Sequence, residues 1–281
     1  MKTSTTVKDY YERNTRLFLW LGGGRAGGVI HRALWLPGVA NRPAALQAVH
    51  GLIAAAAPHP AAGLRVLDLG CGAGGSLCAL AQMPALGLEH GLGVTLSRTQ
   101  VQLAARRAQD LGLADRLRFL QADFTCLPQL EPPVDLAYAV ESFVHGTQPP
   151  AFFEGVQRCL APGGRLVLVD DFLTPLGAAD PRHPVVTEFQ RGWHAPGLMS
   201  AAAAAKLAAA YGLILVEDRS LSAFLRLNTW RDRWTAVSAG FIRRLGLRGA
   251  YFDSLMGGDA LRSAHCAGLI DYRMITFERP V

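Results

Sequence analysis

The chain lacks the features of a secreted, membrane-spanning or disulfide-bonded protein. No apolar run reaches the ~18–20 residues that cross a bilayer, and the first sixteen residues, MKTSTTVKDYYERNTR, have no apolar segment of the kind found in a secretory signal. The five cysteines are an odd number and form no Cys-x-x-Cys pair, which disfavours a disulfide framework or a zinc site. We therefore expect a reduced, cytoplasmic protein with no integral membrane segment and no resident metal.

Charge is also sparse, because only 18% of the 281 residues are Asp, Glu, Lys or Arg, and the net charge is +6. The arginines are spread along the chain, and no nucleic-acid-binding motif is present. Half of the residues are hydrophobic, which provides for a large core and disfavours disorder. We expect no nucleic-acid partner, and the sequence leaves a homo-oligomer open.

What the sequence does contain is a regular alternation of short apolar segments with helical ones. Strands separated by helices at this spacing predict βαβ units and a mostly parallel sheet. Two regions do not follow the alternation: residues 1–63, which are helical in pattern and rich in aromatics, and residues 226–262. The expected strands are 64–69, 90–97, 116–123, 134–142, 165–173, 213–221 and 269–279.

The first strand ends in an unusual turn, LDLGCGAGG, in which an acid precedes four closely spaced glycines. A strand-to-helix turn at the carboxyl edge of a parallel sheet is where ligands bind, and glycines allow both a tight turn and a close approach. The spacing fits the dinucleotide fingerprint, but the next strand ends in GVTLS, without the acid that would hold a ribose. Asp68 instead favours a ligand that carries an ammonium group.

This segment resembles motif I of the class I S-adenosylmethionine-dependent methyltransferases. Two later segments support the resemblance: LQADF, in which Asp123 would take the adenine amino group and Phe124 would pack near the ring, and CLAPGGRLVLVD before the fifth strand. The family implies a Rossmann-like α/β fold, with a mostly parallel seven-stranded sheet and helices on both faces. It also implies S-adenosylmethionine as cofactor, bound by a turn that includes Asp68, Gly70, Gly72 and Gly74.

A narrower resemblance is to the sterol and geranyl diphosphate C-methyltransferases and the cyclopropane fatty-acid synthases. The segment GVTLSRTQVQLA is similar to theirs, so Thr95 and Gln100 would make the ribose and backbone contacts. The opening YYERNTRLFLWLGGG resembles the start of sterol methyltransferases through Tyr10, Tyr11 and Thr15, with Tyr11 near the cofactor. We therefore expect residues 1–63 to form a helical lid on a methyltransferase domain of residues 64–281, with insertions at about 174–198 and 226–262.

Enzymes of this branch transfer a methyl group to a carbon–carbon double bond, which leaves a carbocation. The site must stabilise that cation and remove a proton. In AYAVESFVHG, Glu141 is an acid at the end of an apolar strand, and the resemblance assigns it the role of the base. His145 would share a face with Glu141 if the chain turned helical there. A structural role for Glu141, as a helix cap or an exposed acid, remains open.

The acceptor pocket is expected to use the lid and the insertions. Aromatic residues Tyr10, Trp20 and Trp193 are candidates for contact with the acceptor. A diphosphate head group would need cations, which Arg25, His31 and Arg32 could supply. No Asp-Asp-x-x-Asp motif is present, and the adjacent Asp170 and Asp171 would point to opposite faces of a strand. Magnesium is therefore expected only if the acceptor is a diphosphate.

The sequence favours C-methylation of an alkene in an isoprenoid or lipid-like small molecule, with Glu141 as base. O- or N-methylation of a small metabolite is the alternative within the same family. A non-catalytic S-adenosylmethionine-binding protein and a nicotinamide oxidoreductase are the alternatives from other classes. The buried acid disfavours the first of these, and the GVTLS strand end disfavours the second.

Overall fold

The computed structural model describes residues 29, 31–58, 63–127, 129–227, 229, 234, 237–239, 244 and 249–281. Its centre is a seven-stranded sheet in the order β3-β2-β1-β4-β5-β7-β6, in which only β7 is antiparallel to its neighbours. This topology confirms the predicted class I methyltransferase fold. The strands are β1 (Leu64–Leu69), β2 (Leu88–Thr95), β3 (Leu117–Gln121), β4 (Val134–Val140), β5 (Leu160–Leu173), β6 (Ile214–Ser220) and β7 (Ile270–Glu278).

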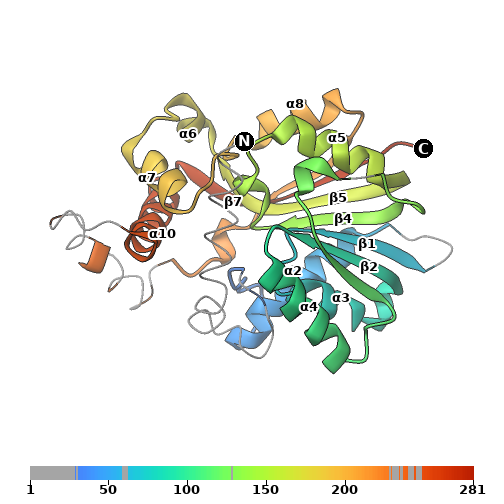
Figure 1. The fold of residues 1–281 in the computed structure, drawn as a ribbon. Coiled ribbons are helices and arrows are strands. Elements are labelled where there is room, and N and C mark those ends of the chain that lie inside the picture. The colour runs from blue at the N-terminus through green and yellow to red at the C-terminus, as the bar shows by residue number, and fades with distance from the viewer. Residues whose placement is uncertain are drawn as a thin grey trace.

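Helices cover both faces of the sheet, as the continuous burial of β4 and the later part of β5 requires. On one face lie α2 (Arg42–Ala56), α3 (Gly75–Ala81) and α4 (Arg98–Asp110), and on the other lie α5 (Pro149–Cys159) and α8 (Ala201–Ala210) (Figure 1). Each face has its own apolar cluster. The carboxyl ends of the parallel strands are left to be covered by other segments.

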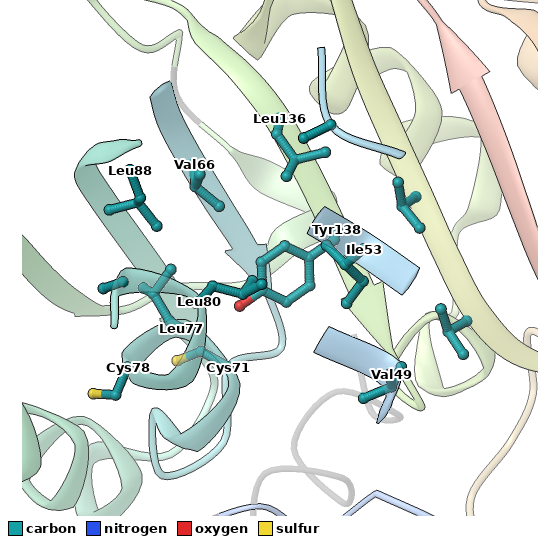
Figure 2. Close-up of a cluster of buried hydrophobic side chains, with 14 of the residues drawn as sticks. Val49, Ile53, Val66, Cys71, Leu77, Cys78, Leu80, Leu88, Leu136 and Tyr138 are labelled. Carbon is teal, nitrogen blue, oxygen red and sulfur yellow. The ribbon is translucent and has the colours of Figure 1, made fainter. Parts of the chain in front are cut away.

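Helix α2 is a structural helix of the sheet rather than part of a separate lid. Val49 and Ile53 of α2 are buried in the same cluster as Leu80 of α3 and Tyr138 of β4 (Figure 2). Asn41 accepts a hydrogen bond from the backbone N–H of Ala44, which fixes the start of the helix. The expected lid over residues 1–63 therefore does not extend over α2, and residues 1–28 lie outside the described part of the chain.

Three helices lie together beyond the carboxyl end of β5: α6 (Pro175–Ala179), α7 (Pro184–Gly192) and α10 (Ala250–Cys266) (Figure 1). Helices α7 and α10 approach closely because glycines face each other, and a Cβ on Gly192 would lie 2.6 Å from the Cα of Gly257. Their apolar side chains form a third cluster with residues around Leu269. The two predicted insertions thus meet each other beside the sheet.

The largest differences between the expected and observed boundaries are in two places. The sequence of residues 74–87 predicts a single helix, but α3 ends at Ala81 and is followed by the 3-10 turn η1 (Pro84–Leu86). Strand β5 begins at Leu160, before the Ala-Pro-Gly-Gly segment that was expected to precede it. Three more 3-10 turns are η2 (Phe124–Cys126), η3 (Phe143–His145) and η4 (Ser222–Phe224). Two of them, η2 and η3, follow strands at the edge where the candidate site lies.

Candidate active site

The glycine-rich turn after β1 needs its glycines for backbone geometry. Gly70, Gly72 and Gly74 have φ values of +92°, +52° and +76°, a region that side-chain-bearing residues rarely adopt. Two of them also permit close packing: a Cβ on Gly70 would lie 2.4 Å from Cβ of Ser142, and one on Gly74 would lie 2.7 Å from Cβ of Ala104. The turn is therefore rigid, and it brings the β1 end against the segment that follows β4.

Asp68, at the end of β1, is buried and accepts a hydrogen bond from the Tyr138 hydroxyl at 2.7 Å. Figure 2 shows the ring of Tyr138 among apolar side chains, with its hydroxyl directed toward the turn that carries Cys71. Burial raises the pKa of Asp68 to about 7, although the Tyr138 hydrogen bond opposes the rise. A cationic group placed beside this carboxyl would favour its ionised form.

The two residues predicted to replace the ribose-binding acid contact each other. Thr95 Oγ1 donates to Oε1 of Gln100 at 2.6 Å, and both side chains are buried. Ser97 between them caps α4 by accepting from the backbone N–H of Gln100. The pair thus organises the start of α4, and a contact of either residue with ribose stays a prediction.

Asp123 caps η2, and Phe124, its first residue, lies close to the glycine turn. Oδ1 of Asp123 accepts from both the backbone N–H and the hydroxyl of Thr125. The ring of Phe124 packs edge-on against Phe152, with centroids 5.4 Å apart, and its edge lies 3.9 Å from the Cβ position of Gly70. The carboxyl of Asp68 near the end of β1, the carboxylate of Asp123 and the ring of Phe124 therefore lie at the same edge of the sheet, and these groups fit the predicted cofactor.

Glu141 follows β4 in a strained conformation, with φ at +49°. Its Oε1 accepts three hydrogen bonds: from the backbone N–H of Arg32 at 2.8 Å, from Nε of Arg32 at 3.0 Å and from the Tyr272 hydroxyl at 2.9 Å. The 3-10 turn η3 begins only at Phe143, so the expectation that Glu141 and His145 share a helix face is wrong. The side chain is held by distant parts of the chain instead.

Arg32 links this carboxylate to a second one. Its NH1 and NH2 groups donate to the two oxygens of Asp171 at 3.1 and 2.7 Å, and its guanidinium lies 4.0 Å from the centre of the Tyr272 ring. His265 Nε2 lies 2.9 Å from Oδ1 of Asp171. Burial alone would raise the pKa of Asp171, but Arg32 and His265 hold it below its usual value. We call Arg32, Glu141, Asp171, His265 and Tyr272 the charge network.

Asp170, the neighbour of Asp171, has a different environment, as the alternation of a strand predicts. Its Oδ2 accepts from the backbone N–H of Val144 at 3.2 Å and its Oδ1 from that of Asp171. Burial raises the pKa of Asp170 well above its usual value, and the negative charge of Asp171 adds to the rise. Asp170 therefore supports η3 in surroundings that favour its protonated form, while the surroundings of Asp171 favour its ionised form.

The candidate histidines His31 and His145 are half-buried, and their lowered pKa values favour the neutral ring at pH 7. His145 Nδ1 donates to the carbonyl oxygen of His194 at 3.0 Å, and burial lowers its pKa, which the nearby Glu141 and Asp171 partly oppose. His31 Nδ1 lies 3.0 Å from the carbonyl oxygen of Arg32, and burial lowers its pKa as well. Neither imidazole supplies the cation that a diphosphate would need.

The remaining predicted substrate contacts divide into two groups. Trp193 packs against Phe189, and its Nε1 donates to the backbone carbonyl of Ser254 at 3.1 Å, so it joins α7 to α10. Tyr10, Trp20 and Arg25 lie outside the described residues, as do Tyr11, which was predicted to lie near the cofactor, and Thr15. Within the described residues, no cluster of three or more His, Cys, Asp or Glu side chains could hold a metal ion.

Sequence reasoning missed three members of the charge network. Tyr272 lies in β7, where nothing in the sequence distinguishes it from the other aromatic and aliphatic residues of the strand. His265 lies in the final turn of α10. Asp171 was noted only as one of two adjacent acids. Its side chain is almost fully buried, and an acid inside the apolar segment LVLVDDFL is the one signal that could have marked it.

None of the helices in the described residues is both long and apolar enough to span a bilayer.

Comparisons with known proteins agree with this geometry. A family described as "Methyltransferase domain" matches residues 66–164. The 24-methylenesterol C-methyltransferase 2 of Oryza sativa subsp. japonica is 29% identical over 231 residues, which cover 82% of this chain and 61% of the rice protein. The O-methyltransferase rstn1 of Aspergillus nomiae is 33% identical over 138 residues, 49% of this chain and 59% of that protein. The chain thus spans about three fifths of the length of these two relatives.

Solved structures match over nearly the whole chain. The cyclase SpnF superposes with a TM-score of 0.77 and 25% identity, covering 99% of this chain and 97% of SpnF. A geranyl diphosphate methyltransferase in complex with geranyl diphosphate and sinefungin superposes with a TM-score of 0.78 and 20% identity, covering 99% of each chain. From the motifs, the sheet order and these matches, the chain belongs to the class I S-adenosylmethionine-dependent methyltransferases, as a relative of the sterol C-methyltransferases that shares its fold with geranyl diphosphate C-methyltransferase and the cyclopropane synthases.

Proposed function

We propose that this protein methylates a carbon of a carbon–carbon double bond in an isoprenoid or lipid-like small molecule. S-adenosylmethionine, when bound, supplies an electrophilic methyl group on a positively charged sulfur. Asp68, the glycine turn, Asp123 and Phe124 would hold it at the carboxyl end of β1. Because β1 and β4 are neighbours in the sheet, Glu141 lies beside that position. The placement of Glu141 is the observation that carries the proposal.

Glu141 has one oxygen committed to the protein and one left for the acceptor. Oε1 takes all three hydrogen bonds from Arg32 and Tyr272. Among the residues that the structure describes, no donor binds Oε2. A carboxylate held in this way keeps a fixed orientation while it presents a basic oxygen. Oε2 is therefore the atom to which we assign the proton transfer.

The alkene gives its π electrons to the methyl carbon as the bond from that carbon to sulfur breaks, which leaves a carbocation on the acceptor. Oε2 of Glu141 then takes a proton from the carbon next to the cation, and a double bond forms again. The ion pairs favour this course, because one guanidinium, Arg32, lies between two carboxylates, Glu141 and Asp171. The resulting net charge of −1 stabilises a developing cation.

Transfer of a labelled methyl group tests the proposal. Purified protein is incubated with S-adenosylmethionine labelled in its methyl group and with alkenes of three kinds: a sterol with a side-chain double bond, a prenyl alcohol and a prenyl diphosphate. We expect label in an organic-soluble product, and mass spectrometry and NMR should place it on carbon. Added EDTA should leave turnover of the sterol and the alcohol unchanged, since magnesium is required only if the acceptor is a diphosphate.

O-methylation of a small metabolite is the second candidate, and two observations favour it. The Aspergillus nomiae relative is an O-methyltransferase, and a buried neutral histidine such as His145 suits removal of a proton from a hydroxyl. In that reaction the oxygen attacks the methyl carbon, the carbon–sulfur bond breaks and the hydroxyl proton passes to the imidazole. Label on oxygen instead of carbon distinguishes this candidate from the first, and no label in any product excludes both for the acceptors tested.

A further inference from the structure

His31 holds an unused hydrogen-bond acceptor. A carbonyl oxygen can only accept, so the contact of Nδ1 with the carbonyl of Arg32 at 3.0 Å places the proton of the neutral ring on Nδ1. Nε2 then carries a lone pair. This atom is buried, and within the described part of the chain it has no hydrogen-bond partner. A buried lone pair without a donor is costly, so this position calls for a donor from a ligand.

The position of His31 indicates where such a ligand would lie in the candidate site. Its ring meets that of His50 edge to face, with centroids 5.3 Å apart, and His50 Nε2 lies 3.1 Å from the hydroxyl of Ser76. Ser76 is the second residue of α3, directly after the glycine turn. On its other side, His31 is followed by Arg32, whose backbone N–H binds Glu141. His31 therefore lies between the cofactor turn and the proposed catalytic carboxylate.

The charges at this place disfavour an anionic ligand. Burial lowers the pKa of His31, so the ring is neutral at pH 7. Arg32 is the nearest cation in the sequence, but its Nε, NH1 and NH2 groups all donate to Glu141 and Asp171. The two carboxylates outnumber it. A diphosphate next to Nε2 would meet a lone pair and a net negative charge, whereas a neutral hydroxyl would meet the acceptor that it needs.

We infer that the acceptor molecule carries a hydroxyl group that donates a hydrogen bond to Nε2 of His31. The inference rests on the proposed function and names the class of its substrate: a neutral, hydroxyl-bearing molecule rather than a diphosphate. A site built to bind a hydroxyl rejects the analogue that lacks it, because the buried partner is then left unpaired. Under C-methylation the hydroxyl orients the acceptor. Under O-methylation it is the nucleophile.

Two variants of His31 separate Nε2 from Nδ1. His31→Asn keeps a donor at the position of Nδ1 for the carbonyl of Arg32 and removes the acceptor at Nε2. His31→Gln places an amide oxygen near the position of Nε2 and loses the Nδ1 donor. If Nε2 binds the ligand, Asn is the damaging change and Gln retains part of the affinity. If His31 only supports the backbone of Arg32, the order is reversed.

The probes are three matched pairs, measured by calorimetry in the presence of S-adenosylhomocysteine: a sterol and its 3-deoxy counterpart, farnesol and the same chain ending in a methyl group, and 2-naphthol and naphthalene. We expect at least one hydroxyl compound to bind about tenfold or more tightly than its partner, and farnesyl diphosphate to bind more weakly than farnesol. His31→Asn should abolish that preference, and His31→Gln should keep most of it.

Three outcomes would overturn the inference. One is that no pair prefers the hydroxyl compound, which would mean that Nε2 binds a water molecule only. Another is a preference that survives in His31→Asn while the affinity for S-adenosylhomocysteine stays unchanged. The third is an unchanged preference together with at least a tenfold loss of S-adenosylhomocysteine affinity in His31→Asn, which would show that the donor belongs to the cofactor. Failure of the proposed function is seen separately, as an absence of methyl transfer to any compound while the hydroxyl preference persists.

Discussion

The two sides of the candidate site are built by different means. The side assigned to the cofactor is made by one short segment, Asp68 to Gly75, whose shape is fixed by left-handed glycines and by hydrogen bonds from Gly70 and Cys71 to the carbonyl of Val94. The side assigned to the acceptor is made by charged and polar side chains from five places in the chain. The first depends on space and backbone conformation, and the second depends on charge balance.

This difference predicts how each side fails. Filling the space at the glycine turn should disturb folding and cofactor binding together, since backbone and ligand use the same atoms. Neutralising a member of the charge network should change the rate or the stability and leave the cofactor turn intact. Variants on the two sides therefore allow cofactor binding to be separated from chemistry.

The largest effect is expected from Glu141→Gln, which keeps the shape of the side chain and removes its charge and basicity. Loss of a positioned base lowers the rate by typically 10²–10⁴-fold. Affinity for S-adenosylhomocysteine should change little, because the turn after β1 is untouched. Single-turnover rates with the labelled cofactor measure the effect, and the exposed Glu154→Gln is the matched control. A rate within a few-fold of the parent, with an alkene acceptor, would remove Glu141 from the role of base.

Arg32→Met tests the charge balance of the network. Without the guanidinium, the half-buried Glu141 and the buried Asp171 are two carboxylates with no cation between them. Removing one partner of a buried pair costs about 3–5 kcal/mol of unfolding free energy. Denaturant unfolding should show this loss for Arg32→Met and little change for Arg118→Met, an exposed arginine on β3.

Adding Glu141→Gln to Arg32→Met should recover part of the lost stability, because one of the two uncompensated charges is then gone. A double variant that is less stable than Arg32→Met would contradict the charge-balance argument. It would indicate that packing of Arg32 on the ring of Tyr272 provides most of its contribution.

The same contrast explains what the sequence could predict. The glycine turn and the strand β1 were predicted from residues 64–75, because their causes are local: a short apolar segment, closely spaced glycines and the start of a helix. The contacts of Arg32 with Asp171 and of Glu141 with Tyr272 join residues 139 and 131 positions apart. No local pattern encodes such contacts. Arg32 was predicted to bind a substrate because its partners in the fold could not be read from its neighbours in the chain.

Helix α2 shows the limit in another way. Its sequence, RPAALQAVHGLIAAA, correctly predicts a helix, but it is apolar on most sides and does not reveal what it packs against. Grouping it with the aromatic N-terminal residues as a lid followed from chain order alone. The structure places Val49 and Ile53 in the core beneath β4, as Figure 2 shows.

Gly70→Ala tests the cofactor side. The new methyl group would meet Cβ of Ser142 at 2.4 Å, on a backbone with φ at +92°. Gly112→Ala is the matched control, because Gly112 also has a positive φ, +69°, but no atom within 4 Å of its Cβ position. Both changes strain the backbone. Overpacking against Ser142 should make Gly70→Ala less stable than Gly112→Ala by a further amount of about 1–3 kcal/mol. Denaturant unfolding measures the difference, and Gly112→Ala should retain the parent affinity for S-adenosylhomocysteine. Equal destabilisation would show that Ser142 moves aside freely.

The smallest expected effect is a pH dependence of cofactor binding that arises from Asp68. Its pKa in the folded protein is about 7, above the ordinary value, because the carboxyl is buried. The folded state therefore favours the protonated form, so the contribution of Asp68 to stability is lost as the pH rises from about 4 to 7. A ligand with an ammonium group favours the ionised form, so its affinity should rise through pH 7. Between pH 6 and pH 8 the ionised fraction grows about tenfold at most, which limits the gain in affinity for S-adenosylhomocysteine to the same factor. Calorimetry at both pH values measures it, and Asp68→Asn, which cannot ionise, should bind weakly and equally at the two. Parent affinity that is flat from pH 6 to pH 8 would mean that Asp68 does not face the ammonium group, and the cofactor side would then need another acid.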